Sequence, residues 1–160
     1  MIFAFFESIK YVGHLFPVAI LRIYMGQWFL RLAFDKYNGD FLLQPKLAAA
    51  ITEFLPGSTA PEWYRSLMDA VVVPNWQIFA YSLMYFEFLI GVGLIVGFLS
   101  RPLALLATVV AWNYLYTSPT ELWPMYKMVM VVGLVLAWLG AGRCMGLDYF
   151  FFKRQRGLLW

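Results

Sequence analysis

Residues 86–101 read FEFLIGVGLIVGFLSR and place one carboxylate, Glu87, inside a long apolar run. The run extends from about Trp76 to Leu99, and about 20 apolar residues are enough to cross the hydrocarbon core of a bilayer. An ionisable group at that depth is costly unless it faces the interior of a helix bundle and has a partner. Gly93 and Gly97, four residues apart, indicate a smooth surface for close helix contact. Glu87 therefore needs a partner from elsewhere in the chain.

The composition of the whole chain indicates a membrane protein. Of its 160 residues, 62% are hydrophobic and 13% are charged, and the mean hydropathy is +0.70. A soluble domain has about 45–50% apolar and about 25% charged residues. We therefore expect an all-α fold, a polytopic membrane four-helix bundle that forms one transmembrane domain over residues 1–160. The chain has one cysteine, Cys144, and therefore no intrachain disulfide. It has one histidine, His14, which excludes bis-histidine haem ligation within one copy, and the sequence offers no metal site.

Apolar runs predict four spans, at about residues 11–34, 76–99, 102–116 and 125–141. The external loop, residues 37–75, is more polar, and prolines open two short helices predicted within it, Pro45–Phe54 and Pro61–Ala70. Ser100 is expected to cap the third span. Basic residues in the loops favour both termini in the cytoplasm and the 37–75 loop outside.

The first span carries Arg22 too deep to reach the membrane surface easily. On a helix, Arg22 shares one face with Gly26, Phe29, Ala33 and Lys36. Since Glu87 is the carboxylate expected at the same depth, near the midplane, the sequence predicts that Arg22 and Glu87 are neighbours. Such a pair has two interpretations: a structural ion pair that locks two helices together, or a group that works on protons or a quinone. Glu87 and Arg22 are thus the candidate catalytic residues.

Three blocks of the sequence resemble the DoxX family. They are Leu21-Arg22-Ile23 with Gly26, Phe29-Leu30, Ala33 and Lys36; Glu87 with Gly91, Gly97 and Ser100-Arg101; and Gly140-Ala141-Gly142-Arg143 with Leu147-Asp148. The resemblance implies a four-helix membrane protein of the prokaryotic cytoplasmic (inner) membrane, related to the small subunit of thiosulfate:quinone oxidoreductase. Structural roles are expected for Gly93, Gly97, Arg101, Gly140, Gly142, Arg143 and Asp148. Among these, Arg143 and Asp148 are expected to tie the end of the fourth helix to the cytoplasmic surface.

Three functions remain open from the sequence. The first is a membrane subunit of a quinone-linked oxidoreductase complex, with no intrinsic cofactor and with a quinone held near Arg22, Lys36 and Glu87. Its site is expected in an outward-facing polar opening that Lys36 lines and the 45–70 helices close. The second is a non-catalytic subunit that anchors or stabilises a larger membrane complex. The third, a small transporter, is less favoured because neither an inverted repeat nor a broken helix is evident. The expected partners are membrane lipid and other membrane or peripheral oxidoreductase subunits, and nothing points to nucleic acid.

Overall fold

The structure is a computed structural model that describes residues 15–154, with the side chains of residues 15–151. Every regular element in that range is helical, which confirms the all-α expectation for this part of the chain. The four longest helices are α2 (Phe16–Asn38), α5 (Trp76–Val96), α6 (Ser100–Tyr116) and α7 (Trp123–Leu139). The shorter elements are α3 (Lys46–Phe54), α4 (Glu62–Leu67), the π-helical turn η2 (Met68–Val72), the 3-10 turns η3 (Thr120–Leu122) and η4 (Ala141–Arg143), and α8 (Asp148–Arg154).

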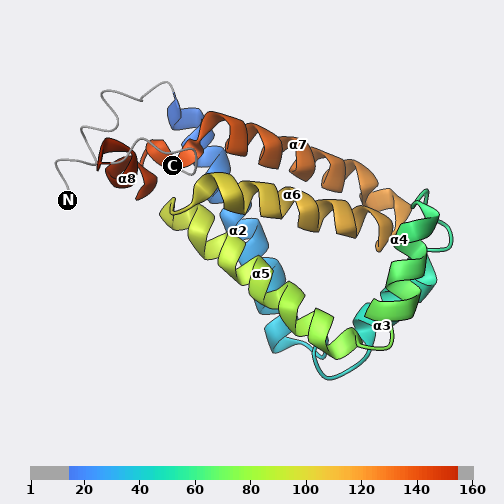
Figure 1. Cartoon of the computed structure of the whole chain (residues 1–160). Coiled ribbons are helices and arrows are strands. Elements are labelled where there is room, and N and C mark those ends of the chain that lie inside the picture. Colours follow the sequence, from blue (N-terminus) through green and yellow to red (C-terminus); the bar gives the residue numbers. More distant parts are fainter. Residues whose placement is uncertain (1–14, 155–160) are drawn as a thin grey trace.

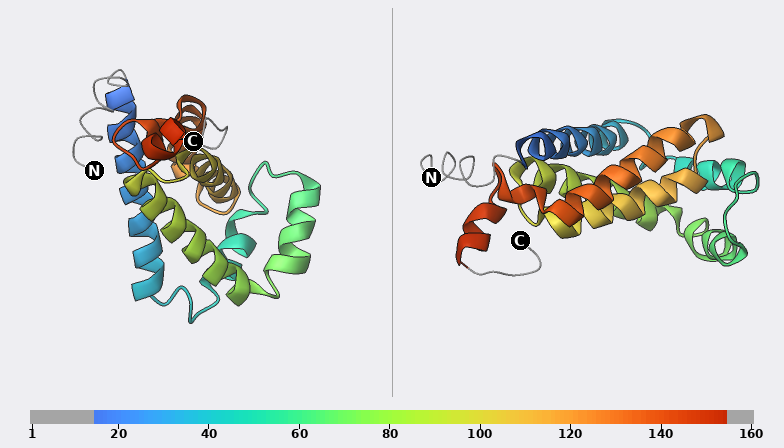
Figure 2. Two further views of the ribbon diagram at one scale, coloured as in Figure 1. Left: turned by 60° about the vertical axis from the view of Figure 1, so that its left-hand side comes forward. Right: turned by 90° about the horizontal axis from the view of Figure 1, so that it is seen from above.

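The long helices pack as two pairs. Helix α2 lies along α5, α6 lies along α7, and α5 also contacts α6 (Figure 1). The connection from α2 to α5 folds into an arm made of α3, α4 and η2, which lies at one end of the molecule. The start of α2 and helix α8 lie at the opposite end, as both views in Figure 2 show. We call these two ends the arm end and the α8 end.

The predicted spans agree with the long helices to within a few residues where the structure describes them. Helices α5, α6 and α7 begin within two residues of the expected positions. The first span was expected at residues 11–34, of which 11–14 lie outside the described residues. Helix α2 begins at Phe16, with Pro17 in its first turn, and continues to Asn38. His14 also lies outside the described residues.

The arm contains the two short helices expected in the connection. Pro45 and Pro61 stand just before α3 and α4 as their cap residues. Helix α4 passes directly into η2, where the N–H of Val73 donates to the carbonyl of Met68, five residues earlier, at 2.9 Å. Apolar side chains of the arm pack against one another and against the first turns of α5: Leu42, Leu47, Ile51, Leu55, Ala60, Tyr64, Met68 and Val72, with Ala80 and Met84.

The backbones of α2 and α5 approach closely at two glycines. A Cβ added at Gly26 would lie 2.9 Å from the carbonyl oxygen of Gly91, and one added at Gly91 would lie 2.9 Å from the amide nitrogen of Leu30. Glycine at both positions permits this contact, as small residues do where helices pack tightly. The contact fixes the antiparallel register, in which Phe34 of α2 meets Phe88 of α5 with ring centroids 6.2 Å apart.

A tight turn joins α5 to α6. Gly97 ends α5 with a φ of 72°, in the left-handed region that glycine adopts without a steric penalty. Its N–H and that of Phe98 both donate to the carbonyl of Gly93, at 2.8 and 3.0 Å, so the end of the helix is satisfied. Leu99 follows with a φ of 51°, an uncommon conformation for a residue with a side chain.

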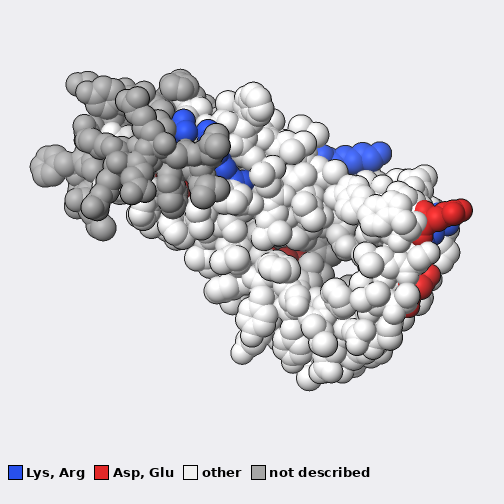
Figure 3. Space-filling view, in the orientation of Figure 1, with Lys and Arg blue, Asp and Glu red and all other residues white. Residues whose placement is uncertain are grey.

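Two helical segments in the described part of the chain are long and apolar enough to cross a membrane: Trp76–Val96 and Thr120–Leu139. Helix α2 is longer but carries Arg22, Arg31 and Lys36, and α6 has 17 residues. Large apolar side chains are exposed along all four long helices, including Tyr24, Ile78, Tyr85, Val109, Met128, Val131 and Trp138. Figure 3 shows one face on which charged side chains gather at the two ends and the middle is almost uncharged.

We expect Gly91→Ala to destabilise the protein by about 1–3 kcal/mol, the usual cost of overpacking a tight contact. The added methyl group meets backbone as well as side chain of Leu30, so a rotamer change alone cannot relieve it. The measurement is the melting temperature of the detergent-solubilised protein. Gly57→Ala is the matched control, because the nearest atom to its Cβ would be 3.9 Å away. Equal melting temperatures for the two variants would contradict the close approach of α2 and α5.

Candidate functional site

Three side chains from three helices form one buried polar group, which we call the Glu87 cluster: Lys36, Glu87 and Tyr114. Glu87 of α5 is fully buried. Lys36 of α2 places its Nζ 2.8 Å from each carboxylate oxygen, and Tyr114 of α6 donates its hydroxyl to Oε1. A buried carboxylate is tolerated when it is both paired and hydrogen-bonded, and Glu87 meets both conditions.

Aromatic rings complete the surroundings of Lys36. Its Nζ lies 5.4 Å from the ring centroid of Phe41 and 5.3 Å from that of Tyr114, within the range of cation–π attraction. The ring of Tyr114 in turn stacks on Tyr126 of α7, with centroids 5.4 Å apart. The Glu87 cluster therefore connects α2, α5 and α6 directly and reaches α7 through Tyr126.

Arg22 does not meet Glu87, so the expected Arg22–Glu87 pair is wrong. Arg22 is fully buried, and its Nη1 donates to the carbonyl of Ala141 at 3.1 Å and to that of Cys144 at 3.5 Å. Its Nη2 donates to the carbonyl of Met145 at 3.1 Å. These acceptors all belong to the segment that follows α7, and the guanidinium is held by backbone oxygens instead of a carboxylate.

The register of α2 against α5 explains the error. The guanidinium of Arg22 packs against Gly97, where a Cβ would collide with it. Glu87 lies ten residues before Gly97 in α5, which is about 15 Å along the helix axis at about 1.5 Å per residue. A first span starting at residue 11 places Arg22 halfway across, but α2 starts at Phe16 and Arg22 falls in its second turn. Lys36, on the same face of α2, is the cation that reaches Glu87.

A second buried polar group lies at the α8 end. The carboxylate of Asp148 accepts the N–H of Leu99 at 2.8 Å, the N–H of Ser100 at 2.9 Å and the hydroxyl of Ser100 at 2.5 Å. The first N–H groups of a helix have no partner within the helix and favour a negative charge. Asp148 thus caps α6 from 48 residues away, which replaces the expected capping by Ser100. It is fully buried at the start of α6, and its expected role in tying the end of α7 to the cytoplasmic surface stays a prediction.

The remaining residues expected to be structural surround this capping interaction. Gly142 donates its N–H to the hydroxyl of Ser100 at 3.0 Å. Gly140 ends α7 with a φ of 64°, and a Cβ there would lie 2.9 Å from the Nε of Arg101. Gly93 lies against the side chain of Leu103 in α6. Arg143 is half-buried in η4.

A cavity of about 270 Å³ lies between the arm and the α5–α6 pair, and Figure 3 shows the surface hollowed on this side. Its walls come from α3, α4, η2, α5 and α6 and are apolar except for Ser82 and Asn113: Leu47, Ile51, Leu67, Met68, Val72, Phe79, Leu83, Phe86, Leu106, Val109 and Val110. The expected polar opening lined by Lys36 differs from this cavity, because the ammonium of Lys36 turns to Glu87. Leu83 and Val110 in the wall stand one helical turn before Glu87 and Tyr114.

Aromatic side chains hold the arm against the end of α6. Asn113 donates its Nδ2 to the hydroxyl of Tyr64 at 2.8 Å, and the Tyr64 ring lies 5.2 Å from that of Trp112 and 5.5 Å from that of Tyr116. Burial, followed by the nearby Tyr116, raises the pKa of Tyr64 above its usual value, so its hydroxyl stays protonated at neutral pH. Trp63 is exposed beside it.

Sequence reasoning missed Tyr114. Its contact with Glu87 arises from the packing of α6 on α5. No spacing within α6 indicates that contact. The pairing of Lys36 with Glu87 did have a signal, since Lys36 shares the face of α2 that carries Gly26 and Ala33.

The DoxX family matches residues 18–117, which run from α2 to the residue after α6. The matched region contains Arg22 and the whole Glu87 cluster, whereas residues 140–148 lie outside it. Comparisons with curated proteins and with solved structures found no match.

We expect Glu87→Gln and Lys36→Met each to lower the stability of the solubilised protein by about 3–5 kcal/mol, because each leaves one buried partner uncompensated. The double variant should lose clearly less than the sum of the two, since it removes both charges. Thermal unfolding of the four proteins in one detergent gives the coupling energy.

Arg22→Met supplies the control for this cycle. Combined with Glu87→Gln, its effect should be additive, because the two residues belong to separate groups about 15 Å apart along α5. Strong coupling of Glu87 to Arg22 but not to Lys36 would contradict the arrangement described.

Proposed function

Because this chain belongs to the DoxX family, we propose that it is a four-span integral membrane protein and a membrane subunit of a quinone-linked oxidoreductase complex. The family is associated with membranes, and α5 and Thr120–Leu139 are long apolar helices. Helices α2 and α6 pack beside them and expose apolar side chains such as Ile20 and Val109. In this proposal all four cross the cytoplasmic membrane of a prokaryote, with both termini inside and the arm outside.

The burial of charge supports this placement. Arg22, Glu87 and Asp148 are fully buried, and each forms hydrogen bonds within the chain. Charged side chains inside a membrane normally face the interior of a bundle and pair there. Between the arm end and the α8 end, the exposed surface of the long helices is mainly apolar, which suits contact with lipid tails.

The observation that carries the redox proposal is the Glu87 cluster standing one helical turn from the cavity under the arm. A quinone, when bound, accepts two electrons and two protons. The cavity suits the ring of such an apolar molecule in its polarity, with Ser82 and Asn113 as hydrogen-bonding groups in an otherwise apolar wall. Asn113 uses one N–H on Tyr64 and keeps a second donor available, since an amide group has two.

The residues of this chain would have separate roles. Asn113 would orient the bound ring through its second N–H, whereas the hydroxyl of Ser82 already donates to the carbonyl of Ile78 at 2.8 Å. The Glu87 cluster would hold an exchangeable proton close to the cavity, with Lys36 balancing the charge of the carboxylate and Tyr114 offering the hydroxyl. Arg22 has no part in this site, because its guanidinium is directed to the backbone at the α8 end. Electrons would come from a partner subunit or from a reduced substrate.

A second candidate is a non-catalytic subunit that anchors or stabilises a larger membrane complex. Its support is that both oxygens of Glu87 are already bonded within the chain. Such a closed cluster suits the locking of helices as well as it suits proton handling. The exposed apolar face of α7, with Val131 and Trp138, offers a surface for a neighbouring subunit.

The orientation can be tested with a single introduced thiol. Thr59 is exposed in the arm and the native Cys144 is buried, so Thr59→Cys should react with an impermeant maleimide in cells whose outer barriers have been removed. The unmodified chain serves as the control for Cys144. Labelling of Thr59→Cys only after lysis would reverse the proposed orientation.

Quinone binding can be tested by gentle purification from native membranes, followed by extraction of quinone and identification of co-purifying proteins. We expect about one quinone per chain, lost in Ser82→Phe because the larger side chain fills the cavity. Val92→Phe is the matched control, since Val92 is exposed on α5 and lies outside the cavity wall. A tightly bound complex without quinone would favour the anchoring function instead.

A further inference from the structure

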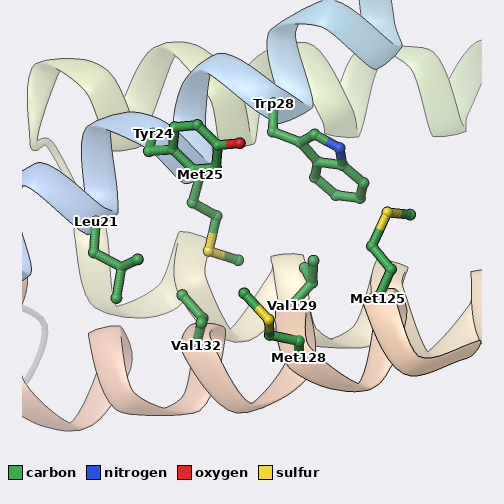
Figure 4. A pocket seen from close by; sticks show the side chains of 8 residues that line it. All are labelled: Leu21, Tyr24, Met25, Trp28, Met125, Met128, Val129 and Val132. Carbon is green, nitrogen blue, oxygen red and sulfur yellow. The ribbon is translucent and has the colours of Figure 1, made fainter.

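A second cavity lies on the opposite pair of helices, between α2 and α7. It has a volume of about 190 Å³ and is open on one side. Figure 4 shows Leu21, Tyr24, Met25 and Trp28 of α2 facing Met125, Met128, Val129 and Val132 of α7 across it. Its walls are almost wholly apolar. Helices α2 and α7 have few contacts with each other, which leaves a groove between them.

One end of this groove is polar. Tyr24 and Trp28 also line a smaller cavity of about 50 Å³, whose other walls are Gln27 and Arg31. In Figure 4 the hydroxyl of Tyr24 points along α2 toward Trp28, which is the direction of Arg31 in the helix. Arg31 is exposed and has neither a hydrogen bond nor an ion pair with the residues that the structure describes. Asp35, one turn further along α2, forms no ion pair with it.

We propose that this groove holds one anionic phospholipid, with an acyl chain between α2 and α7 and its phosphate at Arg31 and Gln27. The guanidinium group of arginine is suited to phosphate because its fork of N–H donors can bind two oxygens at once. The amide of Gln27 adds a donor on the same face of the helix, four residues before Arg31. A net negative headgroup matches an arginine that has no ion pair with the carboxylates that the structure describes.

The position of Arg31 along the molecule agrees with a lipid headgroup. Helix α7 begins at Trp123, and the ring of Tyr126 in its first turn lies 6.4 Å from that of Trp28. Arg31 follows Trp28 by three residues, so its charge lies at the arm-side end of the groove, beside the start of α7, and the groove runs back from it over about 10 Å from Trp28 to Leu21.

This inference rests on the proposed membrane placement but not on quinone binding, which concerns the cavity under the arm. The test is native mass spectrometry of the delipidated full-length protein in detergent, titrated with dioleoyl phosphatidylglycerol or dioleoyl phosphatidylcholine. We expect one phosphatidylglycerol bound more tightly than phosphatidylcholine. Arg31→Gln should weaken phosphatidylglycerol binding by about tenfold, equivalent to about 1.4 kcal/mol, and should reduce the preference between the two lipids.

Two matched controls separate this site from general lipid adhesion. Lys127→Gln removes one positive charge from an exposed position on α7 that lines neither cavity. It should change the affinity for phosphatidylglycerol by no more than about twofold, compared with about tenfold for Arg31→Gln. Met125→Trp fills the groove and should abolish binding, whereas Val131→Trp on the exposed face of α7 should not.

Three results would overturn the proposal. Equal losses for Arg31→Gln and Lys127→Gln would show lipid held by general charge alone. A dimer that Met125→Trp dissociates would show that a second copy covers the groove. Quinone displaced by Met125→Trp but retained by Ser82→Phe would assign the groove to a quinone. If Ser82→Phe loses quinone and Met125→Trp does not, quinone binds under the arm and the lipid site in the groove is supported. The quinone proposal and the lipid proposal are therefore tested by different variants.

Discussion

The close approach of α2 and α5 at Gly26 and Gly91 determines which polar groups can meet. Because neither glycine has a side chain, the two backbones lie in contact and cannot slide past each other without a clash. That register places Arg22 beside Gly97 at the α8 end and brings Lys36 within reach of Glu87 near the arm end. The position of Arg22 and the pairing of Lys36 with Glu87 therefore both follow from one helix contact that involves no charged residue. In this protein, small residues at a helix interface therefore determine the positions of the buried charged side chains.

The two polar groups use different chemistry for different purposes. Arg22 and Asp148 bind mainly backbone atoms. Arg22 donates to carbonyls of the irregular segment after α7, and Asp148 accepts from the N–H groups at the start of α6, which have no hydrogen-bond partner within the helix. The Glu87 cluster consists of side chains on three regular helices, with a cation, an anion and a hydroxyl in contact. The Glu87 cluster stands one helical turn from the cavity under the arm, whereas Arg22 and Asp148 lie at the α8 end.

Much of the architecture could be predicted because it depends on local sequence. Apolar runs predicted the long helices, and the prolines of the connection predicted the short helices of the arm, to within a few residues. The pairing of charges could not be predicted in the same way, since it depends on register between helices. The assumed start of the first span moved Arg22 to the depth of Glu87, whereas the helix starts at Phe16. Tyr114 and the long-range cap by Asp148 depend on packing across 27 and 48 residues, and no local pattern carries that information.

The capping of α6 by Asp148 and the carbonyl bonds of Arg22 have a consequence for biosynthesis. Arg22 is made 119–123 residues before the carbonyls that receive its guanidinium. At about 5–20 residues per second, its side chain waits about 6–25 s for them. Helix α6 likewise has its first N–H groups exposed until the last residues of the described chain arrive. The segment after α7 therefore completes both sets of contacts. A chain that ends at residue 140 has every long helix that the structure describes but none of the carbonyls that bind Arg22, and a chain that ends before residue 148 lacks the cap of α6.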